Sequence, residues 1–267
     1  MTENEKEHLD LIQERFTRTA AEFSKFVQER RSGEGERLTR MLLAGWSRAE
    51  EAVALDVACG PGTFSLPLAG RIRKIWGLDF TAAMLEQARV HAARVGRRNA
   101  RFLRGTVYAL PFRDGALDAT LCGYCFHHFQ EPARALAEML RVTRPGGRIG
   151  LVDLVVPLGG SVDRANAIER ARDPSHASTL TAIQLRGLFA TSGLHIVSEE
   201  RCENVRSFEE WMHVSGHEKG TSVYSEVEAL LAATIADDAA GFHPRRNETG
   251  ALEYVQTTLF LVAEKPR

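Results

Sequence analysis

The sequence predicts an α/β protein built on a doubly wound, mostly parallel sheet with helices on both faces. Between residues 52 and 156, short apolar runs alternate with segments of helical periodicity, a pattern typical of parallel strands joined by helical crossovers. A glycine turn, Gly60-Pro61-Gly62, directly follows the first apolar run, where doubly wound sheets bind nucleotides. A chain of 267 residues has room for one such domain with additions.

Helices are expected before the sheet. Apolar side chains recur at helical spacing through residues 6–30, which predicts one or two amphipathic helices. The Ser-Gly-Glu-Gly segment at 32–35 is expected to break them, and a further helix follows at 36–46. We expect residues 1–48 to form a helical lid on the core.

The strands of the alternating region are expected at 52–58, 74–78, 100–103, 117–122 and 148–156. Thr81 is a candidate N-cap for the helix after the second strand, and Pro132 suits the first position of the helix after the fourth. Arg-Pro-Gly-Gly at 144–147 is expected to end that helix, because glycine readily takes the left-handed conformation.

The alternation stops near the C-terminus. A helix is expected from Ser178 or Thr179 to Gly193, in a segment that follows a loop after the fifth strand. The segments after it predict a strand at 194–198, a mostly helical stretch at 207–246 and a final strand at 256–263. We interpret this as a core domain of residues 49–267 with a helical insert at about 204–250.

Composition argues against several classes of protein. The formal net charge of −1 is unlike that of a general nucleic-acid binder, which needs a basic face. The charged N-terminus lacks a signal peptide's apolar core, and no apolar run approaches the ~20 residues of a membrane span. Cys122 and Cys125 form a C-x-x-C, but no second motif completes a metal site. We expect a cytoplasmic monomer or homodimer that binds neither metal, membrane nor nucleic acid.

Two features define the nucleotide site more closely. Ser65 stands where the dinucleotide fingerprint has its third glycine, which argues against NAD and favours a nucleoside without phosphates. Asp79 ends the second predicted strand, where a carboxylate accepts hydrogen bonds from a ribose diol. The alternative for Asp79 is a simple acidic residue at a helix N-terminus.

Five segments together resemble a known family: 55–63, 77–88, 109–112, 126–129 and 141–148. Their order and spacing are similar to those of class I S-adenosylmethionine-dependent methyltransferases, specifically the ubiquinone/menaquinone-biosynthesis-type (methyltransferase type 11) branch. The resemblance implies a Rossmann-like sheet of seven strands with an antiparallel last strand, and S-adenosylmethionine as cofactor.

The resemblance also implies roles for single residues. Asp56 and the backbone of Ala58, Gly60 and Gly62 should meet the amino-acid part of the cofactor, and Asp79 its ribose. The adenine and sulfonium ends should be lined by Phe80, Met84, Thr106, Val107, Cys122 and Gly123. Thr106 replaces the aspartate usual in the family, which weakens the expected contact to the adenine amino group. Met84 is equally well explained as a core residue.

Methyl transfer needs an aligned nucleophile in a water-poor pocket, and a base where the acceptor carries a proton. Histidine suits that task, and the candidates are His127, His128 and His176, with Tyr124 to orient the acceptor. The alternative is that the histidines only anchor loops. Asp153 lacks the neighbouring acidic and amide residues of a magnesium site, so a metal-free reaction is expected.

Aromatic residues in the N-terminal helices and the insert favour a small hydrophobic or aromatic acceptor; they are Phe16, Phe23, Phe26, Phe208 and Trp211. They could equally pack the lid against the core. Arginines near 164–172 could attract an anionic group, although most exposed arginines have no such role. The rival functions are a Rossmann-type NAD-dependent oxidoreductase and a non-catalytic S-adenosylmethionine-binding module.

Overall fold

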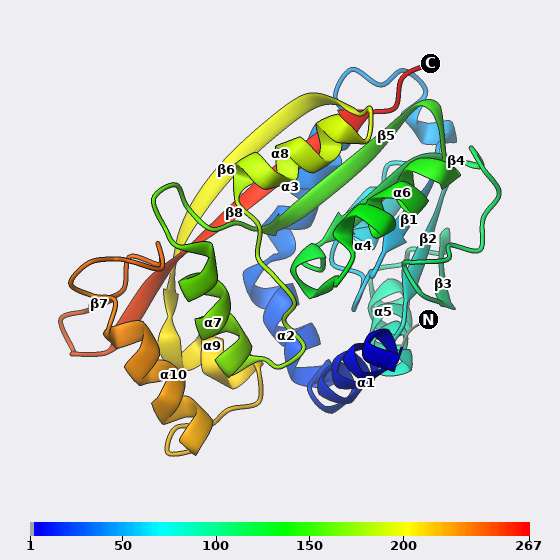
Figure 1. Cartoon of the computed structure of the whole chain (residues 1–267). Helices are drawn as coiled ribbons and strands as arrows, with labels where there is room; N and C mark the ends of the chain where they lie inside the picture. The colour runs from blue at the N-terminus through cyan, green and yellow to red at the C-terminus, as the bar shows by residue number, and fades with distance from the viewer. Residues whose placement is uncertain (1–2) are drawn as a thin grey trace.

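The computed structural model describes residues 3–267, in which one sheet has the strand order β3-β2-β1-β4-β5-β8-β6, with β7 paired to β8 (Figure 1). The parallel strands are β1 (Val53–Val57), β2 (Lys74–Asp79), β3 (Ala100–Arg104), β4 (Leu117–Gly123) and β5 (Thr143–Leu154). The last long strand, β8 (Leu252–Glu264), runs antiparallel to β5, β6 (His195–Ser207) and the short β7 (Arg245–Arg246). The predicted doubly wound sheet with an antiparallel last strand is confirmed.

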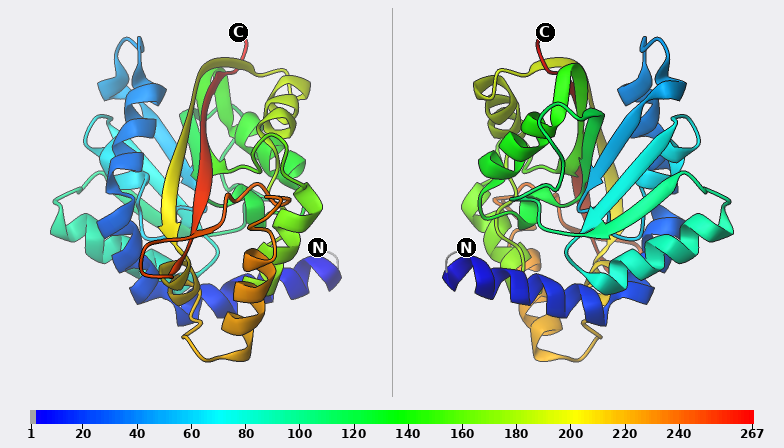
Figure 2. Two further views of the ribbon diagram at one scale, coloured as in Figure 1. Left: turned by 90° about the vertical axis from the view of Figure 1, so that its left-hand side faces the viewer. Right: turned by 90° about the vertical axis from the view of Figure 1, so that its right-hand side faces the viewer.

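Helices cover both faces of the sheet (Figure 2). One face packs against α3 (Ser32–Leu43), α4 (Ser65–Ala69) and α5 (Ala82–Arg94). The other face packs against α6 (Pro132–Val142) and α8 (Ala182–Thr191). Because β1 and β4 are neighbours whose crossovers run to opposite sides, their carboxyl ends border the crevice where such folds bind ligands.

The N-terminal segment forms two helices, α1 (Glu3–Arg18) and α2 (Ala20–Arg30). They meet at Thr19, whose hydroxyl donates to the Arg15 carbonyl oxygen. In Figure 2, α1 crosses one end of the sheet, and both helices place apolar side chains in the cavity at the carboxyl ends of the strands.

The break between helices lies at Arg31, before the glycines that were expected to cause it. Gly33 and Gly35 lie inside α3, which begins at Ser32. A Cβ on Gly35 would collide with the carbonyl oxygen of Thr63 and the ring of Pro67. This glycine therefore permits close packing of α3 against the segment before α4. A short 3₁₀ turn, η1 (Ala49–Glu51), then leads into β1.

The segment after β5 also differs from expectation. An unpredicted helix, α7 (Val162–Arg172), occupies the predicted loop. The next helix, α8, begins after Thr181 rather than at residues 178–179, because Thr181 and Gln184 form a reciprocal capping box. The predicted helix end at 144–147 lies instead within β5, since α6 stops at Val142.

The strand predicted at 194–198 continues to Ser207. The side chains of β6 are mostly polar on both faces, so no apolar alternation marks this strand in the sequence. Its extended conformation is held by pairing with β8 along the whole strand. Between β6 and β8 the chain contains α9 (Phe208–Val214) and α10 (Ser222–Ala232), fewer helical residues than expected. These helices pack with α7 around a separate apolar cluster.

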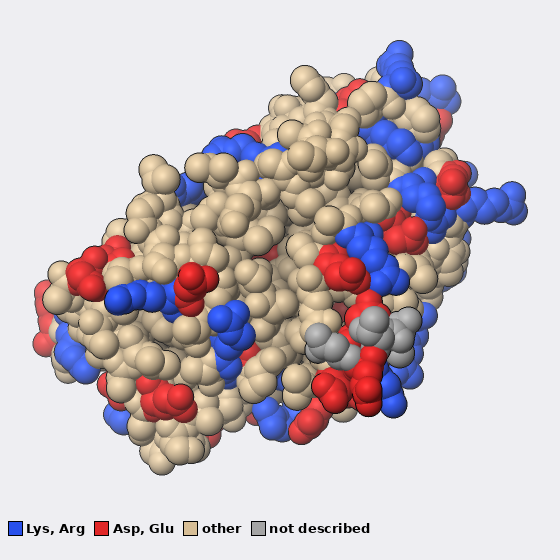
Figure 3. All heavy atoms as spheres, in the orientation of Figure 1, with Lys and Arg blue, Asp and Glu red and all other residues tan. Residues whose placement is uncertain are grey.

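Among residues 3–267, no helix is both long and apolar enough to cross a membrane. On the face seen in Figure 3, basic side chains are scattered among acidic and uncharged ones, so this face carries no broad basic surface. The expected absence of nucleic-acid binding stays a prediction, as does the division into a lid and a core domain.

Candidate functional site

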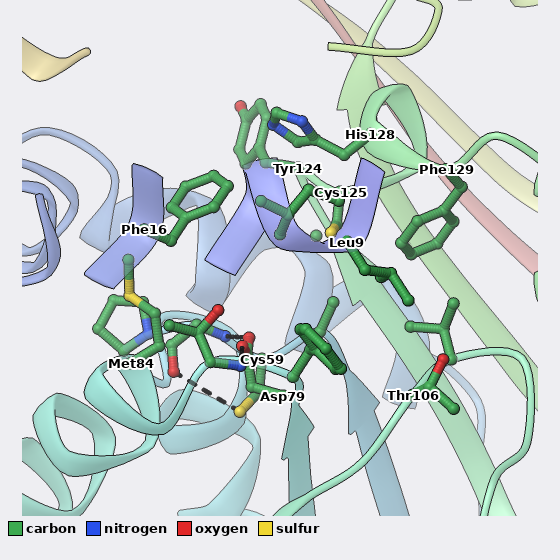
Figure 4. Close-up of a pocket in the computed structure, with 18 of the residues that line it drawn as sticks. Leu9, Phe16, Cys59, Asp79, Met84, Thr106, Tyr124, Cys125, His128 and Phe129 are labelled. Atoms are coloured by element: carbon green, nitrogen blue, oxygen red, sulfur yellow. Dashed lines mark hydrogen bonds between the residues drawn. The ribbon is translucent and has the colours of Figure 1, made fainter. Parts of the chain in front are cut away.

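A cavity of about 1040 Å³ opens at the carboxyl ends of β1, β2 and β4, beneath α1 and α2 (Figure 4). We call it the glycine-loop cavity. Of the residues predicted for the site, its lining includes Ala58, Gly60, Asp79, Phe80, Met84, Thr106, Val107, Gly123, Tyr124 and His128. Asp56, Gly62, Cys122, His127 and His176 lie outside that lining.

The turn after β1 has an unusual backbone. Ala58, Gly60 and Gly62 all have positive φ angles, of 55°, 51° and 84°. For Ala58 this conformation is strained, and such strain persists only where surrounding contacts hold it. Asp79 provides one of these contacts, since its Oδ2 accepts the Gly60 N–H at 2.8 Å.

Asp79 lies between the turn and the cavity. Its Oδ1 accepts the Thr81 N–H at 2.8 Å, so each carboxylate oxygen holds one backbone donor and keeps a second lone pair. Burial raises the pKa of Asp79, whereas the backbone donors lower it. The arrangement orients a carboxylate with free acceptor capacity into the cavity.

Asp56 lies fully buried in β1, below the turn. The Ser65 hydroxyl donates to its Oδ2, while its Oδ1 has no hydrogen-bond partner. Burial raises the pKa of Asp56 to about 7. A buried carboxylate oxygen without a donor suits a cationic or N–H group of a ligand.

The far end of the cavity holds the residues after β2 and β3. Phe80 directly follows β2, the buried Met84 lies in the first turn of α5, and Thr106 and Val107 come from the loop after β3. The Thr106 Oγ1 accepts the Tyr108 N–H at 3.3 Å, so its own hydroxyl proton stays available.

The residues at the end of β4 point in different directions. Cys122 is fully buried and packs in the core with α6, so the prediction that it lines the pocket is wrong for its side chain. Gly123 lines the cavity, and a Cβ there would collide with the Phe64 ring. Tyr124 has a positive φ of 55°, and its hydroxyl lies 3.2 Å from Thr258 Oγ1. Burial raises the pKa of Tyr124, so the phenol stays neutral.

His128 ends the short η2 turn (Phe126–His128) and lies in the cavity wall beside Tyr124 (Figure 4). Its Nδ1 lies 2.8 Å from the carbonyl oxygen of Ser175, so Nδ1–H donates and Nε2 is left unprotonated. Burial lowers the pKa of His128 well below its usual value, as do the neighbouring His127 and Arg15. The ring is therefore a neutral acceptor at the wall.

The other two histidines are held away from this cavity. His127 donates to both oxygens of Asp153, from Nδ1 to Oδ1 at 2.6 Å and from its backbone N–H to Oδ2 at 2.9 Å. His176 donates from Nε2 to Asn166 Oδ1 at 2.7 Å and is buried. This geometry fits loop anchoring for both residues.

A second cavity of about 640 Å³ adjoins the first, and we call it the aromatic chamber. It shares a wall with the glycine-loop cavity, formed by Phe16, Phe23, Arg31, Tyr124 and His128. The remaining lining comes from the N-terminal helices, η2, β5, α7, α9 and the ends of β6 and β8. It includes the predicted site residue His127, together with Phe26, Arg206, Trp211, Tyr254 and Gln256. Sequence reasoning missed Arg31, Arg206, Tyr254 and Gln256, since they come from distant segments without a shared motif.

Polar contacts from both ends of α1 hold this helix over the cavities. His8 donates from Nε2 to the His128 carbonyl oxygen at 2.8 Å, and Arg15 forms a buried ion pair with Asp173. In the described part of the chain, no cluster of three or more His, Cys, Asp or Glu residues is arranged to hold a metal ion.

The family model described as "Methyltransferase domain" matches residues 55–151. The uncharacterized methyltransferase YcgJ of Bacillus subtilis (strain 168) is 32% identical over 192 residues, 72% of this chain and 76% of that protein. A crystal structure of YcgJ superposes with a TM-score of 0.77 at 24% identity, covering 86% of this chain and 99% of the other.

A demethylmenaquinone methyltransferase of Deinococcus radiodurans is 38% identical over 126 residues, 43% of this chain and 52% of that protein. The chain therefore matches only about half the length of that relative. The region that the family model matches, residues 55–151, contains the glycine turn and the ends of the first strands. The aromatic chamber also includes residues outside that region, up to Gln256.

Proposed function

Because the chain belongs to the class I S-adenosylmethionine-dependent methyltransferases, we propose that it methylates a small hydrophobic or aromatic acceptor bound in the aromatic chamber. The observation that carries the proposal is the shared wall of the two cavities, where Tyr124 and His128 face both. A donor bound on one side and an acceptor on the other would meet at that wall. Family membership also argues against the NAD-dependent oxidoreductase.

The glycine-loop cavity suits S-adenosylmethionine in three respects. The Asp79 carboxylate has acceptor capacity left for a ribose diol. The backbone of Ala58 and Gly60 suits the charged amino-acid end, and the unpartnered Asp56 Oδ1 is buried behind this turn, outside the cavity lining. Gly62 would act through the shape of the turn, because it lies outside the lining.

The adenine would lie between Phe80 and Met84, with Thr106 and Val107 at its edge. A threonine hydroxyl that already accepts from Tyr108 can donate to a ring nitrogen, which an ionised aspartate cannot. Gly123 would lie beside the sulfonium, and its missing Cβ lets the Phe64 ring, also in the cavity lining, pack against the backbone there.

When bound, S-adenosylmethionine supplies an electrophilic methyl group on its sulfonium. His128 would take the proton of a phenol, amine or acidic carbon on Nε2, because Nδ1 is committed to Ser175. Tyr124 would orient the acceptor through its neutral hydroxyl. Water would be excluded by apolar side chains of α1 and α2, which include Leu9, Phe16 and Phe23. His127 and His176 would position the loops around the site.

The test is incubation of the purified chain with S-adenosylmethionine and a panel of phenols, hydroquinones, amines and acidic-carbon compounds. Mass spectrometry should find acceptor mass increased by one methylene group together with S-adenosylhomocysteine. Tight S-adenosylmethionine binding without product from any acceptor class would support the non-catalytic binding module instead. Failure to bind the cofactor would refute the proposal.

A further inference from the structure

Four arginines line the aromatic chamber: Arg15, Arg31, Arg172 and Arg206. Two of them are neutralised by carboxylates. Arg15 pairs with Asp173, and Arg172 pairs with Glu169 at 2.8 Å. These two ion pairs explain half of the positive charge as part of the fold.

The other two guanidinium groups have no such partner among the described residues. Arg31 donates from Nη2 to the neutral amide oxygen of Gln256 at 3.0 Å, and its guanidinium lies 3.7 Å above the Tyr124 ring. The Nε atoms of Arg31 and Arg206 are both buried without a hydrogen-bond partner. The one carboxylate in the chamber lining, Glu210, pairs with Arg30 at 3.0 Å.

Strand register brings Arg31 and Arg206 to the same wall. Even-numbered residues of β6 face inward and are half-buried, whereas odd-numbered ones are exposed. Arg206 stands opposite Tyr254 of β8, and Gln256, two residues further, binds Arg31. Residues two apart on a strand share a face, so both guanidinium groups lie beside the same pair of β8 side chains.

The surroundings make an unneutralised pair of charges costly. Phe23, Phe26, Trp211 and Tyr254 form much of the chamber wall, and buried donors without acceptors destabilise the fold. Such a cost is offset when a ligand brings an anion. Guanidinium groups bind carboxylates in the plane of the fork, with two parallel N–H donors.

We propose that the methyl acceptor carries a carboxylate, bound by Arg31 and Arg206 beside Gln256 in the aromatic chamber. The apolar or aromatic body of the acceptor lies between the aromatic walls and reaches Tyr124 and His128. This inference rests on the proposed function and narrows its acceptor class to carboxylic acids with an apolar or aromatic body.

The test uses matched probes that differ only in charge: 4-hydroxycinnamate against 4-hydroxycinnamamide, and 4-hydroxybenzoate against 4-hydroxybenzamide. Calorimetry on protein saturated with S-adenosylhomocysteine should find the acid bound at least ~10-fold more tightly than its amide, as expected for hydrogen bonds to a charged group. Arg206→Met and Arg31→Met should each reduce this preference to about twofold or less, because each removes one guanidinium from the carboxylate site.

The control is Arg201→Met, on the same strand. Arg201 lies on the exposed face of β6 and pairs with Glu203, so its loss should leave the preference unchanged. Thermal unfolding checks that each variant is folded, and the acid-to-amide ratio of the unmodified protein tests the proposal even without variants.

Equal affinity for acids and amides, or no binding of any acid, overturns the inference. So does an acid preference that survives in both folded variants. These results differ from failure of the proposed function, in which S-adenosylhomocysteine does not bind or no acceptor is methylated. A protein that methylates neutral acceptors without preferring acids refutes the carboxylate site alone.

Discussion

Asp79→Ala tests the cofactor assignment most directly. In the structure this carboxylate holds the N–H groups of Gly60 and Thr81 and is the acidic group of the cavity wall at the end of β2. Its removal therefore deletes two contacts that shape the turn, and the proposed acceptor of the ribose hydroxyls. Both losses weaken binding of the nucleoside.

The magnitude follows from the environment of the carboxylate. Asp79 is only 9% exposed, so solvent does little to replace the lost acceptor. A hydrogen bond to a charged group contributes about 1.5–3 kcal/mol, which corresponds to a roughly 10- to 150-fold loss of affinity. Isothermal titration with S-adenosylhomocysteine measures that loss without turnover.

Asp114→Ala is the matched control. Its carboxylate is 82% exposed and pairs with Arg141 outside the cavity, so the variant should bind S-adenosylhomocysteine as the unmodified chain does. An Asp79→Ala protein that is folded by circular dichroism and binds within twofold of the unmodified chain would refute the ribose assignment.

Four further predictions concern residues around the two cavities. His128→Gln should lower kcat by ~10²–10⁴-fold for an acceptor that loses a proton, and it should leave the affinity for S-adenosylhomocysteine unchanged. An unaltered kcat would show that His128 is not the base. Because burial lowers the pKa of His128, this base stays unprotonated to lower pH than an ordinary histidine does. The pH profile of kcat/KM should therefore be flat near neutrality and fall only in acid. A fall centred at the ordinary histidine pKa would contradict the role of His128 as the base. His127→Ala leaves the buried Asp153 carboxylate without its ring partner, so denaturant titrations should find the free energy of unfolding reduced by ~3–5 kcal/mol. A reduction below ~1 kcal/mol would show that the pair contributes little to stability. Gly123→Ala places a methyl group where the Phe64 ring lies, so S-adenosylhomocysteine affinity and the thermal unfolding temperature should both fall. A variant with unchanged affinity and unfolding temperature would show that the ring moves aside freely.

The two adjacent histidines show where pattern reasoning ends. Their position after the fourth strand predicted access to the site for either one. In the η2 turn the two ring centroids lie 4.3 Å apart, but His127 binds Asp153 and borders only the aromatic chamber, whereas His128 lies in the shared wall. Side-chain direction in a turn depends on the backbone angles of each residue, which sequence spacing does not specify.

Local sequence patterns were sufficient for the main features of the fold. The alternation of apolar runs and helical segments predicted the parallel strands, and the glycine turn and Asp79 marked the carboxyl ends of β1 and β2. Those signals are reliable because buried strands need continuous apolar residues and tight turns need glycine. The polar edge strand β6 and the helix α7 lacked such signals, so β6 was predicted only over residues 194–198 and α7 was missed.

Only the tertiary structure brought together the acceptor side of the site. Arg31 meets Gln256 across 225 positions of sequence, and Arg206 joins them through the register of β6 on β8. A shift of one residue in that register would turn Arg206 to solvent, because side chains alternate between the faces of a strand. The sequence by itself thus determined the fold class and the methyl-donor family, while long-range packing and strand register decided which charged and aromatic groups face the acceptor.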